Sequence, residues 1–147
     1  MTDVDNSPIL VVEDDDLVRS FLCRALAGIY ADVDACATGK DALRAVDARR
    51  FGAILLDGLL PDTHGIELAK QLIVHPKATR SGICFVSGSL RHPLVMRDGV
   101  SALPKPLRLR ELLEAVGLLI SWSKDTASAP AARLAALNVL SAGLLVT

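Results

Sequence analysis

The stretch ILLDGLLPDTHGIEL at residues 54–68 contains a strand, a turn and the start of a helix. The uninterrupted aliphatic run within residues 51–56 predicts a strand that is covered on both faces. Asp57 follows that run directly. Residues 65–74 have the apolar spacing of a helix, which the His75-Pro76 pair ends. The stretch therefore predicts a strand–helix unit that carries an acidic side chain at the carboxyl end of its strand.

The same alternation of aliphatic runs and helical patterns extends in both directions along the chain. Residues 17–29 place apolar side chains along one helix face, and Thr38 is suited to cap the next helix. Continuous apolar strands that alternate with helices predict a doubly wound α/β fold, with a five-stranded parallel sheet and helices on both faces. The predicted strands are residues 9–12, 31–36, 51–56, 83–86 and 100–103, and the predicted helices are 17–29, 38–48, 65–74 and 109–119.

The length of 147 residues predicts one domain, and its core is expected to be aliphatic because only 3% of the residues are aromatic. We divide the chain into a leader (1–7), the main domain (8–122), a linker (123–130) and an extra C-terminal helix (131–147). The apolar stripe of this tail predicts either docking within the chain or homodimerisation through the tail or the last domain helix.

The net charge of −1 argues against a dedicated nucleic-acid binder, and we expect no direct DNA binding. The acids are nevertheless clustered, because residues 1–75 carry 13 acids and only 7 bases. Three scattered cysteines argue against a disulfide framework. The N-terminus lacks a secretory pattern, and the longest uncharged run is shorter than the roughly 20 residues of a membrane span. We therefore expect a cytoplasmic protein with no membrane span.

Acidic residues follow two strands that we expect to be neighbours. Glu13 and Asp14 end the first strand, and Asp57 ends the third. Three carboxylates meeting at one sheet edge would repel one another, and a hard cation such as Mg²⁺ would relieve that repulsion. Ser87 and Lys105 end the next two strands, where a hydroxyl and an ammonium group could contact phosphoryl oxygens.

These pieces together resemble the receiver domain of two-component response regulators. The matching motifs are ILVVEDD, ATGKDAL, ILLDGLLPDTHGIEL, FVSGS and LPKPL, which cover about residues 8–122 in the expected order. The resemblance implies a flavodoxin-like sheet with strand order 2-1-3-4-5. It also implies a cis peptide bond between Lys105 and Pro106.

The resemblance further implies the role of each site residue. Asp57 would accept a phosphoryl group from a sensor histidine kinase or a phosphotransfer protein. Glu13, Asp14, Asp57 and the backbone carbonyl of Leu59 would hold Mg²⁺, while Ser87 would be the switch hydroxyl and Lys105 the phosphate-contacting base. Such a protein is a phosphoacceptor switch that signals by protein contact, and we expect no turnover enzyme.

Several positions depart from the family pattern. Ala102 occupies the position of the usual aromatic switch residue, and only 18 residues separate Ser87 from Lys105. We therefore expect the fourth helix of the family to be shortened, displaced or partly unwound. Leu59 places an apolar side chain beside the route of an attacking water, which predicts a long-lived acyl phosphate.

Other functions remain open at this stage. A haloacid-dehalogenase-type phosphatase would need a second acid where Leu59 stands. A pseudo-receiver would keep the fold and work unphosphorylated, and the chain could equally be the receiver portion of a hybrid kinase or a larger regulator. His64 follows Asp57 closely, but a solvent-facing loop position is the simpler interpretation.

Overall fold

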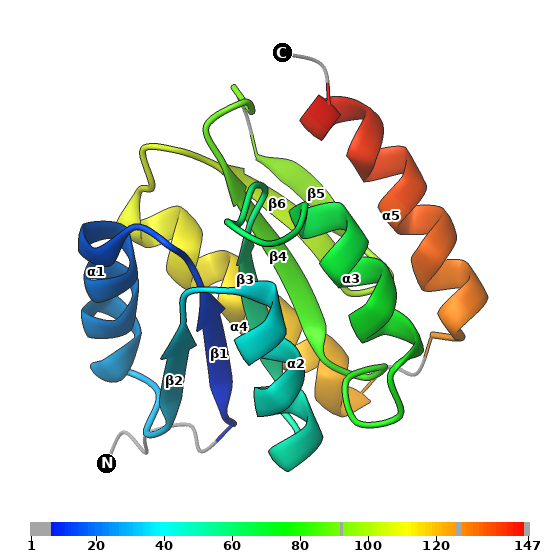
Figure 1. The fold of residues 1–147 in the computed structure, drawn as a ribbon, viewed down its shortest axis with the longest axis horizontal. Helices are drawn as coiled ribbons and strands as arrows, with labels where there is room; N and C mark the ends of the chain where they lie inside the picture. Colours follow the sequence, from blue (N-terminus) through cyan, green and yellow to red (C-terminus); the bar gives the residue numbers. More distant parts are fainter. Residues whose placement is uncertain (1–6, 92, 126–127, 146–147) are drawn as a thin grey trace.

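The protein folds around one six-stranded sheet, seen in Figure 1. The structure is a computed structural model, and it describes residues 7–91, 93–125 and 128–145. The strand order is β2-β1-β3-β4-β6-β5, in which every neighbouring pair is parallel except β5 and β6. The strands are β1 (Ile9–Val12), β2 (Val33–Cys36), β3 (Ala53–Asp57), β4 (Gly82–Ser87), β5 (Leu94–Arg97) and β6 (Val100–Pro104). The doubly wound α/β fold is confirmed, with one strand more than predicted.

Helices cover both faces of the sheet, as expected. Helices α1 (Asp16–Ala27) and α4 (Leu109–Asp125) lie on one face. Helices α2 (Gly39–Ala48), α3 (Gly65–Val74) and α5 (Pro130–Leu145) lie on the other. Successive residues of β1 serve opposite faces, because Leu10 and Val12 pack with α2 and α3 while Ile9 and Val11 pack with α1 and α4. This two-sided burial explains the unbroken aliphatic runs in the sequence.

We expected the family's fourth helix to be shortened, displaced or partly unwound, and the residues that the structure describes between β4 and β6 form no helix. An edge strand, β5, replaces it and pairs antiparallel with β6. Asp98 and Gly99 form the two-residue turn between them, with φ angles of 51° and 73°. Positive φ at both positions is typical of a type I′ hairpin turn, for which Asp-Gly is a preferred dipeptide. The short connection between Ser87 and Lys105 thus contains an antiparallel edge strand, where the family pattern would place a helix on one face of the sheet.

The C-terminal helix docks on its own chain, which was one of the two predictions for the tail. Helix α5 packs beside α3 and over the β5–β6 side of the sheet. Leu137 and Leu140 are buried in the same hydrophobic cluster as Phe85 and Ala102. Helix α4 continues through Asp125, and α5 begins at Pro130. The extra helix is therefore part of the folded unit.

A buried arginine fixes the start of α5. Arg133 is 0% exposed, and its guanidinium donates hydrogen bonds to the backbone carbonyls of Thr79, Ser81, Asp98 and Gly99 at 2.6–3.1 Å. Its charged plane also lies 4.4 Å from the ring centre of Trp122 on α4. Burial lowers the pKa of Arg133 to about 10, so the group stays protonated at neutral pH. One side chain thus joins α5, α4, the β5–β6 turn and the loop before β4.

Polar side chains cap the starts of α1 and α2, and the cap of α2 is the one that the sequence predicted. Thr38 accepts a hydrogen bond from the Asp41 amide at 3.1 Å and caps α2, as predicted. Asp15 caps α1 in the same way, through the amides of Leu17 and Val18.

In the part of the chain that the structure describes, no helix has both the length and the apolar character to cross a membrane.

Candidate functional site

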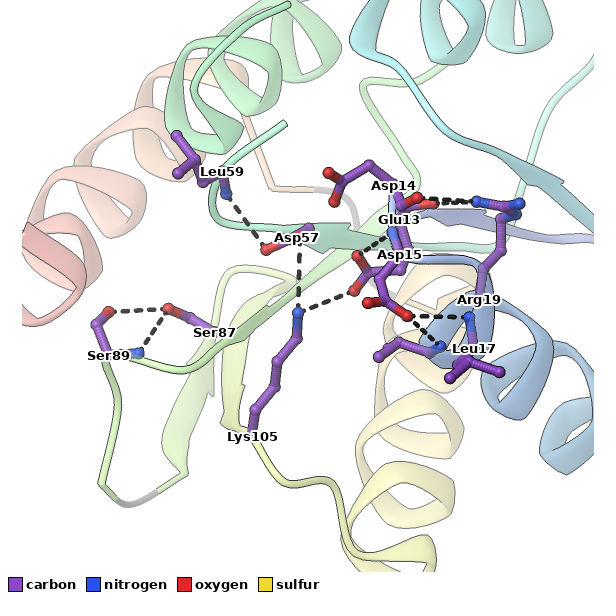
Figure 2. A network of polar contacts seen from close by, with 11 residues as sticks. Glu13, Asp14, Asp15, Leu17, Arg19, Asp57, Leu59, Ser87, Ser89 and Lys105 are labelled. Atoms are coloured by element: carbon purple, nitrogen blue, oxygen red, sulfur yellow. Dashed lines mark hydrogen bonds and ion pairs between the residues drawn. The ribbon is translucent and has the colours of Figure 1, made fainter. Parts of the chain in front are cut away.

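Three carboxylates meet at the carboxyl edge of the sheet, shown in Figure 2. Glu13 and Asp14 follow β1, and Asp57 ends β3, which pairs directly with β1. One oxygen from each carboxylate lies within 4.8 Å of the others. Glu13 is buried, Asp57 is half-buried and Asp14 is exposed. The predicted convergence of the three acids is therefore observed.

Lys105 reaches into this cluster from the end of β6. Its Nζ lies 3.0 Å from Oε1 of Glu13 and 3.6 Å from Oδ2 of Asp57. Burial lowers the pKa of Lys105, but the contacts with Glu13 and Asp57 outweigh this effect and raise the pKa above its usual value. The ammonium group is therefore charged and held against the two carboxylates. The peptide bond between Lys105 and Pro106 is cis, as the resemblance implied.

Glu13 is the most buried carboxylate of the cluster, with 1% of the residue exposed. Burial raises the pKa of Glu13, while a hydrogen bond from the Asp15 amide and the contact with Lys105 act in the opposite direction. The neighbouring Asp57 carboxylate raises this pKa further. A buried acid beside a second acid is destabilised as an anion unless more positive charge is brought to it.

Ser87 ends β4 beside the strand of Asp57. Its Oγ lies 2.8 Å from Oγ of Ser89 and accepts a hydrogen bond from the Ser89 amide at 3.2 Å. The Lys105 amide donates to the Ser87 carbonyl, so the ends of β4 and β6 are held side by side. The hydroxyl is thus engaged with its own loop on the edge of the carboxylate cluster.

Two residues that hold the loops around the site, Arg19 and Asp62, were not predicted from the sequence. Arg19 on α1 donates to the Glu13 carbonyl at 2.9 Å and contacts Asp16 at 2.5 Å, which fixes the loop after β1. Asp62 accepts hydrogen bonds from the amides of Gly39 and Lys40 at 2.9 and 3.0 Å. These amide bonds lower the pKa of Asp62. The Asp62 contacts join residues 23 and 22 positions apart, which the sequence alone does not pair, whereas Arg19 lies three positions from Asp16 and six from Glu13.

A glycine lets α3 approach Asp57 closely. A Cβ at Gly65 would stand 2.4 Å from the Asp57 carbonyl oxygen and 3.0 Å from Cα of Gly58. The Gly65 amide donates to the Gly58 carbonyl at 2.9 Å. The absence of a side chain is therefore required where the loop after Asp57 returns to the strand.

The remaining highlighted residues lie as follows. Leu59 is 70% exposed, and its amide donates to Oδ1 of Asp57 at 3.3 Å; the role of its carbonyl stays a prediction. His64 caps α3, where its Nδ1 accepts from the Ile66 amide, and it is half-buried. Ala102 is buried in the sheet opposite Phe85. The aromatic switch position is thus filled by a methyl group within the core.

The donor set fits a hard divalent cation. Three carboxylates offer oxygen ligands within one small volume, and the buried anion of Glu13 would gain from added positive charge. Mg²⁺ binds oxygen ligands, takes one or two protein carboxylates directly and keeps several waters. Glu13, Asp14 and Asp57 are therefore the residues that could hold it.

Comparison with known proteins identifies the family. The profile of the response regulator receiver domain matches residues 9–117. The transcriptional regulatory protein TcrA of Mycobacterium tuberculosis is 34% identical over 106 residues, which are 71% of this chain and 42% of that protein. The response regulator MprA of Mycobacterium bovis is 32% identical over 139 residues, which are 89% of this chain and 59% of that protein. The chain spans about half the length of these curated relatives.

Solved structures of receiver domains also resemble this chain. The chain matches a CheY-like response regulator receiver domain from Methylobacillus flagellatus with a TM-score of 0.66 and 26% identity, over 78% of this chain and 99% of that one. It also matches the receiver domain of a sensor histidine kinase from Pseudomonas aeruginosa PAO1, with a TM-score of 0.64 and 25% identity. This match covers 79% of this chain and 98% of that one. That structure holds a magnesium ion in its active site cleft.

These relatives correct one expectation from the sequence. The prediction of no direct DNA binding is contradicted, because TcrA is named as a transcriptional regulatory protein. The prediction counted charge only within these 147 residues, whereas the 106 residues that align with TcrA are 42% of that protein. The family itself follows from the profile match, the two relatives and the geometry of the carboxylate cluster. The chain belongs to the response regulator receiver domain family of two-component systems.

Proposed function

We propose that this protein is a phosphoacceptor switch that takes a phosphoryl group on Asp57 from a histidine kinase or phosphotransfer protein. The observation that carries the proposal is the position of Asp57, which lies 3.6 Å from the Lys105 ammonium and within 4.8 Å of the Glu13 and Asp14 carboxylates. An exposed surface acid would have no such surroundings. The activity is a single transfer to the protein's own side chain, followed by slow loss of phosphate.

The transfer needs few groups from this chain. A carboxylate oxygen of Asp57 attacks the phosphorus atom, a P–O bond forms, and the P–N bond of the donor phosphohistidine breaks. The imidazole leaves with the bonding electrons and takes a proton from solvent. Lys105 holds a positive charge beside the attacking carboxylate, where it offsets the charge of the incoming phosphoryl oxygens.

Glu13, Asp14 and Asp57 would hold Mg²⁺ in this proposal, with the Leu59 carbonyl as a further ligand. When bound, the ion neutralises charge on the phosphoryl oxygens and on the acidic cluster. Arg19 and Asp15 keep the Glu13 segment in place through the contacts described above. Metal binding and phosphorylation are therefore expected to depend on the same loop.

A partner surface lies next to the phosphoacceptor site. Leu17 and Phe21 on α1 are 83% and 40% exposed, although both are large and apolar. With Val18, Pro106 and Leu107 they line a groove of about 330 Å³ that also touches Lys105. An apolar surface at the entrance of a charged site supports docking of the donor protein there. The likeness to TcrA supports an output that leads to transcription.

Mass spectrometry after incubation with acetyl phosphate and Mg²⁺ tests the proposal. We expect wild type to gain one phosphoryl group and Asp57→Asn to gain none. Asp125→Asn, an exposed acid at the end of α4, is the matched control and should behave as wild type. If wild type gains no mass while Mg²⁺ is bound, the protein is a pseudo-receiver that works unphosphorylated.

A further inference from the structure

Helix α5 is held unequally along its length. At its start, Arg133 joins four backbone carbonyls and the Trp122 ring. Near this anchor, the Ser128 hydroxyl donates to Oδ1 of Asp98 at 2.9 Å. Among the described residues further along α5, the contacts with the rest of the protein are apolar, through Leu137 and Leu140. One end is therefore fixed by directional bonds and the other by hydrophobic packing alone.

The two ends lie at opposite edges of the sheet. The anchor contacts Ser81 and Gly99, which precede β4 and β6 and so mark the amino ends of these strands. Helix α5 then runs toward the carboxyl edge, the edge of the phosphoacceptor site, as Figure 1 shows. The apolar half of α5 thus lies on the side where the charge of a phosphoryl group would appear.

One short loop connects the site to this apolar half. Ser87 is bound to Ser89 through both the hydroxyl and the amide of Ser89. The next residue, Leu90, is only 7% exposed and belongs to the same hydrophobic cluster as Leu137 and Leu140. If the Ser87 hydroxyl turns to a phosphoryl oxygen on Asp57, its bonds to Ser89 are lost and Leu90 is displaced with the loop.

We propose that phosphorylation of Asp57 loosens the second half of α5 while Arg133 holds its first half in place. The inference rests on the proposed function and adds the element that responds to it. Well-packed cores do not deform continuously, so displacement of Leu90 disturbs the hydrophobic cluster in which Leu137 and Leu140 are buried. The loosened half then exposes the apolar side chains of Leu137 and Leu140, which are buried before phosphorylation.

Hydrogen–deuterium exchange on the full chain tests this proposal, with and without acetyl phosphate and Mg²⁺. The mass of the intact protein is recorded from the same sample, so that the phosphorylated fraction is known. We expect amides of residues 136–142 to exchange at least about threefold faster after phosphorylation. Residues 128–134 should be unchanged, as should the emission of Trp122, the single tryptophan, which packs on the anchor.

Two variants test the connecting loop. Leu90→Ala should speed exchange of residues 136–142 before phosphorylation and leave little further change after it, and Leu90→Val should do so to a smaller degree if the alanine variant folds poorly. Val139→Ala is the matched control, because Val139 lies on the same helix half but is 65% exposed. It should exchange as wild type does in both states.

The outcomes separate the two proposals. A full mass gain with unchanged or slower exchange over residues 136–142 overturns the inference and leaves the proposed function intact. Equal loosening of both halves overturns the role of Arg133 as the fixed end. Absence of any mass gain on Asp57 overturns the proposed function, and the inference falls with it.

Discussion

Arg133 and Trp122 are stacked, with the guanidinium carbon 4.4 Å from the ring centre, although the two residues lie on different helices. Arginine is rarely buried completely, but Arg133 is 0% exposed, and among the described residues its guanidinium donates to four backbone carbonyls and to no carboxylate. Its partners are backbone carbonyls from the loop before β4 and from the β5–β6 turn. The contact therefore fastens the C-terminal helix to the part of the sheet that departs most from the family pattern.

Replacing Arg133 should destabilise the whole fold. Arg133→Met keeps much of the side-chain volume but leaves four carbonyl oxygens without their donor, two of them in buried and two in part-buried hydrogen bonds, so the free energy of unfolding should fall by at least about 3 kcal/mol. Urea denaturation measures the change. Arg110→Met, at an exposed position on α4, should alter the free energy by less than about 0.5 kcal/mol. Similar values for the two variants would contradict the anchoring role.

Glycine is required at the β5–β6 turn but dispensable on α4. Gly99 has a φ of 73°, and a Cβ there would stand 2.6 Å from the Trp122 ring. Gly99→Ala should therefore lower the free energy of unfolding by about 1–3 kcal/mol. A Cβ at Gly117 would have no atom within 4 Å, and alanine favours a helix. Gly117→Ala should therefore raise the free energy of unfolding by up to about 1 kcal/mol. Thermal unfolding of both variants tests the opposite signs.

Mg²⁺ should stabilise the protein through the acidic cluster. A ligand at free concentration L that binds only the native state stabilises it by RT ln(1 + L/Kd), so the unfolding midpoint rises with the Mg²⁺ concentration and with the affinity of the site. Asp14→Asn removes one exposed carboxylate of the cluster and should weaken Mg²⁺ binding at least about tenfold, which a thermal titration with Mg²⁺ would measure. Asp125→Asn should respond to Mg²⁺ as wild type does. An equal response in Asp14→Asn would place the metal elsewhere.

Leu59 should slow the loss of phosphate from Asp57. Its apolar side chain is exposed at the position two residues after Asp57, and its amide donates to Oδ1 of Asp57; an amide side chain at this position could instead orient a water. Leu59→Asn should shorten the acyl-phosphate half-life about threefold or more, a barrier change of under about 1 kcal/mol. The half-life is followed by intact mass after removal of the donor. Leu118→Asn, an exposed leucine on α4, should decay as wild type, and an unchanged rate for Leu59→Asn refutes the role.

Alkaline pH should destabilise the fold through Cys84. Burial raises the pKa of this thiol to about 12 from an ordinary value of 9.0. Between these values the unfolded thiol ionises and the native thiol does not, so stability that is present below pH 9 is lost as the pH rises. Near pH 10 the loss amounts to about 1.4 kcal/mol. Urea midpoints at pH 7.5 and 10 should differ less in Cys84→Ala than in wild type; equal differences would exclude this cause.

The sequence predicted the parts of the fold that local pattern determines. The aliphatic strands β1, β3 and β4 and the acids that follow them stand where expected, because two-sided burial leaves a continuous apolar run. The Thr38 cap and the approach of Lys105 to Asp57 follow from turn chemistry and strand order. These features depend on neighbours in the chain or on adjacent strands.

The missed features depend on distant segments or on a competing interpretation. The Asp98-Gly99 dipeptide is a hairpin signal, but the family pattern favoured a helix in this region. The burial of Arg133 has no local signal, because its carbonyl acceptors exist at every position of every chain. The contact of Asp62 with Gly39 joins residues 23 apart, which one sequence cannot pair.

The docking of α5 also has a consequence for how the chain folds during its synthesis. All the predicted site residues precede residue 106, yet the sheet face over Phe85 and Ala102 is closed only when Leu137 and Leu140 arrive. Until those residues leave the ribosome, a nascent chain exposes an apolar face beside an edge strand, a combination that is prone to aggregation. A chain that ends after Lys105 would therefore contain every predicted site residue, but it would not bury its own core until Leu137 and Leu140 were added.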